Sequence, residues 1–236
     1  MKINKSITRL SIKGSSTMHD KIGNTITHAT LARWLELWSD QAKNTTLHDF
    51  NDLVKRYGEP HRHYHDLSHI SLCLEDLTEA CSHADHPFEV ELAIWFHDAV
   101  YDPRRSDNEE VSARYAQDTL GKLIEKESLE RVQSLILATR HTEPPKNNDE
   151  KLIADIDLAI LGRPTKEYKE YEDEIRQEYG WVPDDRFKAG RAEVLARFLA
   201  REHIYYTDHF REKYEMNARA NLSHSISMLR TSGPYQ

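Results

Sequence analysis

Apolar side chains recur every three or four residues along most of this chain, the spacing that places them on one face of an α-helix. Residues 29–38 show the pattern clearly, with Leu31, Trp34, Leu35 and Trp38 on a single stripe. No segment shows the strict alternation that is typical of a half-buried strand. The pattern therefore predicts an all-α fold of about ten helices, at residues 29–38, 47–57, 66–80, 88–101, 108–123, 129–139, 152–161, 165–179, 187–202 and 210–229.

Two of these segments differ from the usual amphipathic pattern. Residues 88–101 follow Pro87 and are apolar on almost every side, which predicts a helix buried all round. Residues 165–179 carry closely spaced charges of both signs, which predicts a solvated helix face with short-range ion pairs. The sequence does not indicate whether this acidic helix also covers a site.

Composition agrees with a helical domain. The 236 residues include only eight glycines and eight prolines, fewer than turn-rich sandwiches or barrels require. We expect one compact domain over residues 25–230. Residues 1–24 are polar and lack the apolar core of a secretory signal, so we expect a loosely ordered tail there.

Charge and cysteine usage exclude some classes of partner. The formal net charge is −8, opposite in sign to a general binder of nucleic acid or of anionic membranes. No stretch approaches 18 apolar residues, so we expect no membrane span. Cys73 and Cys81 form neither a disulfide framework nor a zinc motif, which favours a reducing, cytoplasmic location.

Histidines gather in one short segment, EPHRHYHDLSHI at residues 59–70. His65 and His69 are four residues apart, and on a helix both rings would point into one cavity. Imidazoles at this spacing are a common way to seat a metal ion, although surface histidines also occur at this spacing.

A second polar pair, His97 and Asp98, follows a strongly apolar run. A buried carboxylate is costly unless it is paired or binds a cation, and a metal ion would satisfy both side chains. A metal-free hydrogen-bonded pair, or two residues at an exposed helix end before Pro103, are the alternatives.

Two aspartates, Asp155 and Asp157, interrupt the apolar stretch IADIDLAIL. Because they are two residues apart they cannot share a helix face, so we expect one to face the core and the other solvent. An inward aspartate again favours a cation, while a role at the helix N-terminus is the alternative.

The order His, His-Asp, Asp resembles the pattern of the HD-domain superfamily of metal-dependent phosphohydrolases. More narrowly, the chain is similar to the bacterial branch described as predicted HD phosphohydrolases. The resemblance extends over about residues 56–222 through the stretches RYGEPHRHYHDLSHI, ELAIWFHDAVYD, NEEVSA, IADIDLAILG, GRAEVLARFLAREHIYYT and ARANL. It implies a helical fold of the HD type.

The resemblance also implies residue roles. YHDLSH is similar to the YHNWxH motif of helical cyclic-nucleotide phosphodiesterases, in which the first histidine donates a proton and the second binds metal. By this likeness His65 is a general acid and His69 is a metal ligand. His97 and Asp98 match the His-Asp doublet of the family, which implies that both bind metal and that Asp98 also takes part in catalysis. The last ligand matches Asp157, with Asp155 as the alternative.

Other candidates are assigned by residue type. Glu109 is a candidate to orient water or a ligand, and His141 is a candidate for a second metal or for substrate. Guanidinium groups suit phosphate, because they donate two parallel hydrogen bonds. The candidate phosphate ligands are Arg62, Arg140, Lys188 and Arg191, and we expect His61 and His63 to be non-ligands.

Nitrogen and oxygen ligands without thiolate suit a divalent ion such as Mn, Fe, Co, Ni, Zn or Mg. The sequence thus predicts a hydrolase that acts on a small phosphate ester or anhydride, most simply that of a nucleotide, by metal-activated water. The sequence does not decide whether the chain forms a homodimer. One alternative is a non-catalytic, metal-bound helical module that binds a nucleotide or a protein. The other is a diiron oxygenase of the HD type, with His65 and His141 as additional ligands.

Overall fold

The computed structural model describes residues 27–231 apart from residues 29 and 41, and over this range the chain is all helical. The all-α prediction is therefore confirmed. The expected tail at residues 1–24 lies outside the described residues. None of the described helices is both long enough and apolar enough to cross a membrane.

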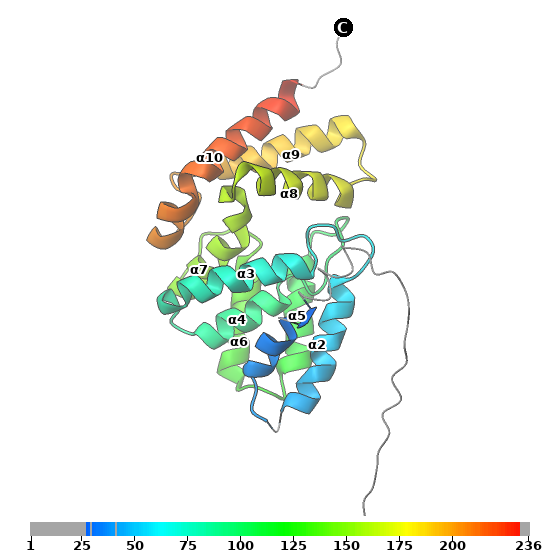
Figure 1. Cartoon of the computed structure of the whole chain (residues 1–236), viewed down its shortest axis with the longest axis vertical. Helices are drawn as coiled ribbons and strands as arrows, with labels where there is room; N and C mark the ends of the chain where they lie inside the picture. Colours follow the sequence, from blue (N-terminus) through cyan, green and yellow to red (C-terminus); the bar gives the residue numbers. More distant parts are fainter. Residues whose placement is uncertain (1–26, 29, 41, 232–236) are drawn as a thin grey trace, which may run out of the picture.

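The helices form two groups that pack end to end (Figure 1). The first begins with a helical segment at residues 30–36 and contains α2 (Lys43–Tyr57), α3 (Leu67–Ala80), η1 (Cys81–His83), α4 (Pro87–Phe96), α5 (Asn108–Leu120), α6 (Lys126–Ala138) and α7 (Asn148–Asp157). The second contains η2 (Leu158–Gly162), α8 (Thr165–Glu178), α9 (Asp184–Leu199) and α10 (Asp208–Thr231).

One cluster of buried apolar side chains extends through both groups, from Trp34 to Ile226. Its largest members are aromatic: the Trp34 ring packs edge-on against Trp95 with centroids 5.4 Å apart. The Trp34 indole nitrogen donates to the carbonyl of Thr46, so this buried polar atom is paired. α4 is buried from Leu92 to Phe96 and at Glu89 and Val90, which agrees with the apolar run from which a buried helix was predicted.

The prediction that this central helix extends to residue 101 is wrong, since α4 ends at Phe96. The carbonyls of Asp98 and Ala99 accept hydrogen bonds from the buried guanidinium of Arg62 instead of from a following helical turn. The early end leaves His97 and Asp98 at a turn rather than within a helix.

The prediction for residues 165–179 is correct for only one face of α8. Lys166 and Glu170 form a solvent-exposed ion pair four residues apart, as the charge pattern indicated. The opposite face is buried through Tyr168, Tyr171, Ile175 and Glu178. This helix therefore joins the second group of helices to the histidine-rich segment of the first.

Two glycines offer a matched test of packing between η2 and α10. A Cβ atom at Gly162 would lie 2.5 Å from Tyr214 Cβ, whereas a Cβ at Gly190 in α9 would meet nothing within 4 Å. We expect Gly162→Ala to lower the free energy of unfolding by about 1–3 kcal/mol through overpacking. Gly190→Ala should raise it by about 0.5–1 kcal/mol, because alanine favours helix more than glycine does.

Urea denaturation of the two variants measures both effects. A Gly162→Ala protein as stable as the parent would show that η2 and α10 are less tightly packed than described.

Candidate metal centre

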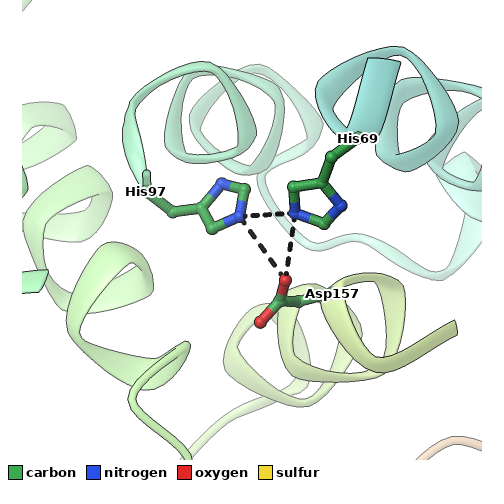
Figure 2. Close-up of side chains that lie close together, drawn as sticks. All are labelled: His69, His97 and Asp157. Carbon is green, nitrogen blue, oxygen red and sulfur yellow. Dashed lines mark hydrogen bonds and ion pairs between the residues drawn. The ribbon is translucent and has the colours of Figure 1, made fainter. Parts of the chain in front are cut away.

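Three side chains from three separate helices converge on one point (Figure 2). His69 and His97 face each other with their Nε2 atoms 3.1 Å apart. Asp157 Oδ1 lies 3.3 Å from His69 Nε2 and 3.4 Å from His97 Nε2. The ligand atoms of the three residues all lie within 4.8 Å of one another, a separation that a single cation could bridge.

Asp98 completes the group. Its Oδ2 atom lies 3.2 Å from His97 Nε2 and 3.6 Å from His69 Nε2. Donors about 2.1 Å from a shared ion are about 3.0 Å apart at a right angle and about 3.4 Å apart at the tetrahedral angle. The separations of 3.1–3.4 Å between His97 and the other three residues lie in this range, and that of 3.6 Å between Asp98 and His69 lies slightly above it. His69, His97 and Asp157 therefore fit a divalent cation, and Asp98 is a candidate fourth ligand.

The local folding of each segment explains how the ligands meet. His69 lies in the first turn of α3, which Asp66 caps by accepting from the backbone N–H groups of Ser68 and His69. His97 directly follows α4, and Asp157 is the last residue of α7. Three helix ends or first turns therefore point at the same site.

Neighbouring groups orient the ligands. His97 Nδ1 lies 2.9 Å from the carbonyl of Ile94, so it donates there and leaves the Nε2 lone pair for a metal. His141 Nε2 lies 2.8 Å from Asp157 Oδ2, the oxygen that does not face the two imidazoles. His141 thus holds the carboxylate of Asp157 from its other side.

The carboxylates in this site remain ionised despite their burial. Burial alone would raise the pKa of Asp98, but the imidazoles of His97 and His65 outweigh it and hold the pKa below the ordinary value. Burial also opposes ionisation of Asp157, whose pKa is nevertheless lowered by hydrogen bonds from His141, His69 and His97. Both carboxylates are therefore ionised beside the imidazoles, the form in which a carboxylate binds a cation.

Asp155 and Asp157 have different partners, which resolves the alternative left open by the sequence. Asp155 is fully buried and accepts from the backbone N–H groups of Tyr206 and Thr207, each at 2.7 Å. Asp155 is the fully buried residue of the two and Asp157 is partly exposed, and their side chains point in different directions. Asp155 anchors the segment before α10, and Asp157 reaches the histidines.

This division gives opposite expectations for two asparagine variants. Asp157→Asn should weaken metal binding by at least about tenfold, because a ligand carboxylate is lost. Asp155→Asn should leave metal affinity unchanged and reduce the free energy of unfolding by about 1–3 kcal/mol, because the new amide NH₂ faces N–H donors. Metal titration and urea denaturation of both variants check this pair, and loss of metal in Asp155→Asn would contradict the assignment.

His65 lies next to the metal centre but not in a helix. It precedes the cap of α3, so the argument from a shared helix face is wrong, although its ring centroid is still 6.0 Å from that of His69. His65 Nδ1 lies 2.6 Å from Glu178 Oε2, and the Tyr101 ring stacks on the imidazole at 4.1 Å. The ring is thus fixed by α8 on one side and by the turn after α4 on another.

Glu178 connects the His65 imidazole to the backbone of residues 63–65. Its Oε1 atom accepts from the N–H groups of His63, Tyr64 and His65, each at 2.9 Å, and Oε2 also accepts from the Tyr101 hydroxyl. Burial would raise the pKa of Glu178, but the hydrogen bond and charge of His65 and these N–H groups lower it to about 2. Burial opposes protonation of His65, yet the charges of Asp98 and Glu178 raise the His65 pKa above its usual value.

A cavity of about 320 Å³ opens beside His65. Tyr101, Glu109 and Tyr171 line it, as do three arginines, Arg105, Arg140 and Arg191. Arg140 forms an ion pair with Glu110, and Arg191 donates to Tyr171 and Glu172. Burial raises the pKa of Glu109, with a smaller contribution from the charge of Asp98. The sequence candidates Glu109, Arg140 and Arg191 therefore share this cavity with His65.

Arg62 does not lie where a phosphate ligand would have to lie. Its side chain is fully buried and donates to the carbonyls of His65, Asp98 and Ala99 and to Glu59. All three nitrogens of this guanidinium donate hydrogen bonds within the protein, so Arg62 has a structural role. The prediction that Arg62 binds phosphate is therefore wrong. Arg62 ties the segment that contains His65 to the turn that contains Asp98. His61 and His63 are exposed, and neither belongs to the converging group.

Sequence reasoning missed Glu178 and Tyr101. Glu178 is one of many glutamates in a charged helix, and only its place at the helix end distinguishes it in the sequence. A scan of protein-family models, a search of curated proteins and a search of solved structures each gave no match for this chain.

Proposed function

We propose that this protein is a metal-dependent phosphohydrolase of the HD type. One observation carries the proposal: three residues that could hold a divalent cation, with Asp98 as a candidate fourth ligand, lie beside an imidazole held by a carboxylate. That imidazole faces a cavity with three arginines. Metal ligands, a proton donor and anion-binding groups are the parts that hydrolysis of a phosphate ester or anhydride requires.

Each part has a chemical role. A divalent cation in such a site supplies activated water and neutralises charge on phosphoryl oxygens. His65, kept protonated by Glu178, is positioned to give a proton to the leaving oxygen. Arg140 and Arg191 line the cavity and would bind the non-bridging phosphoryl oxygens. Glu109 lies in the same cavity and would orient water or substrate.

The substrate class follows from the cavity and the resemblance together. A volume of about 320 Å³ admits a small phosphorylated molecule, and the resemblance favours a nucleotide.

Purified protein, supplied in turn with Mn, Co, Ni, Zn and Mg, would be screened for phosphate release from nucleotides and other phosphate esters. Turnover with at least one ion, abolished by chelator, is the expected result. Metal binding without turnover of any substrate would instead support the non-catalytic binding module.

His141 favours one further candidate, because its contact with Asp157 places a fifth possible ligand at the centre. A diiron oxygenase would use it together with His65. Aerobic protein loaded with iron would then show an absorption band of an oxo-bridged pair, and colourless, hydrolytically active protein would exclude this candidate.

A further inference from the structure

A second and larger cavity borders the metal centre through His141. Its volume is about 490 Å³, compared with about 320 Å³ beside His65. The loop after α6 and the segment between α9 and α10 form its walls, and Arg201, His203 and Arg211 contribute nitrogen donors. Neither the metal centre nor the hydrolytic chemistry proposed above makes use of this space.

Arg201 has fewer hydrogen-bond partners than Arg211, the other arginine of this cavity. Its guanidinium carbon lies 4.7 Å from the Phe198 ring centroid and 5.8 Å from that of Tyr206, so the group is held between two rings. It donates from Nη2 to the carbonyl of His141 at 3.3 Å, and its Nη1 is buried without a hydrogen-bond partner among the described residues. Arg211, in contrast, donates through all three nitrogens.

Nη1 has almost no exposed surface, so it takes a partner from the cavity only when the partly exposed Arg201 side chain turns. An unpaired guanidinium nitrogen is unfavourable, and an oxyanion is the partner that best satisfies it. We propose that this cavity is a binding site for a small oxyanion, the phosphate or carboxylate group of a ligand held by Arg201. Two exposed glutamates, Glu143 and Glu202, also line the cavity. They disfavour further negative charge at the rim, so the rest of the ligand carries hydroxyl or amino groups.

The position of this site couples it to the metal centre. Arg140 lines the cavity of His65, the next residue, His141, bonds Asp157, and the carbonyl of His141 bonds Arg201. His141 also has a φ of 56°, a left-handed backbone conformation that non-glycine residues adopt uncommonly. An anion that binds the Arg201 guanidinium therefore acts, through the carbonyl of His141, on the loop that positions Arg140 and His141.

Hydrogen exchange on metal-free full-length protein tests the site, with inorganic phosphate as the probe. At ten times its dissociation constant, phosphate should slow exchange through local opening at residues 140–146 and 200–207 about tenfold. Arg201→Gln should abolish this protection, and Arg140→Gln, which changes a residue that does not line this cavity, should retain it. Arg201→Lys keeps the charge but loses the planar fork, so it should weaken protection severalfold.

A second arm replaces phosphate with acetate. Protection by phosphate alone indicates a phosphorylated ligand, and protection by both anions indicates that carboxylates also bind. No protection of these two segments by either anion, or equal protection in Arg201→Gln, would overturn the proposal. Because neither metal nor substrate is present, the result does not depend on whether the protein is a hydrolase.

Discussion

Replacement of His97 by alanine is expected to remove the bound divalent cation and, with it, phosphate release. The His97 Nε2 atom lies within 3.1–3.4 Å of donors on His69, Asp98 and Asp157, so it has a position at the centre of the four ligands. Loss of a residue that merely supports a ligand costs about 10–100-fold in metal affinity, and loss of a ligand should cost at least about 100-fold. Elemental analysis and metal titration measure this effect directly.

His63→Ala is the matched control, because His63 lies in the same histidine-rich segment but is exposed. It should keep the metal content and the activity of the parent protein. Equal metal content in His97→Ala and His63→Ala would show that the cation is bound elsewhere, even if both proteins fold normally.

Glu178→Gln should lower the turnover number, although Glu178 is neither a proposed metal ligand nor the proposed proton donor. Glutamine keeps the size of the side chain but places an NH₂ group where Oε2 accepts from Tyr101 and contacts His65 Nδ1. The turnover number should fall by at least about tenfold, because His65 loses the carboxylate that orients it and keeps it protonated. The alkaline limb of the pH–rate profile should move to lower pH, since the His65 pKa is no longer raised by that charge.

The same substitution changes the pH dependence of stability. The pKa of Glu178 is lowered to about 2 in the folded protein, below the value of about 4.3 for an unfolded glutamate. Its ionised form therefore stabilises the fold above about pH 4.3, and the contribution is lost as the pH falls towards 2. Parent and Glu178→Gln should differ by about 1–3 kcal/mol at neutral pH and converge in acid.

Glu174→Gln, one helical turn earlier, provides the control. Burial and the surrounding carboxylates raise the pKa of Glu174 to about 7, so neutralising it should not destabilise the protein. A Glu178→Gln protein with an unchanged pH–rate profile would show that His65 does not act as the general acid through Glu178.

The helical periodicity was sufficient to predict the fold class, because each helix buries a stripe that its own residues define. Short-range patterns also located part of the site. His97 and Asp98 follow a helix that is apolar on almost every side, and polar residues at the end of such a helix require a partner. His69 and Asp157 were identified only through the order of residues and the family resemblance. The structure now places both within 3.4 Å of His97.

The features that sequence reasoning missed depend on contacts between distant segments. Arg62 has the side chain of a phosphate ligand, and only the fold shows that backbone carbonyls occupy its donors. Glu178 is indistinguishable from other acidic residues until α8 packs on residues 63–65. The residue pattern alone could not decide between Asp155 and Asp157, because a helix period does not reveal that Tyr206 and Thr207 supply N–H donors to Asp155.

The candidate ligands come from α3, from the end of α4 and from the end of α7, which are far apart in the chain. A cation bound there acts as a non-covalent cross-link between three helices, and the unfolded chain does not present its ligands together. Folding and metal concentration are therefore linked by mass action. A free ion at 1,000 times its dissociation constant would add about 4 kcal/mol to the free energy of unfolding. The supply of metal in the surroundings would then set how long the protein survives heat or proteolysis.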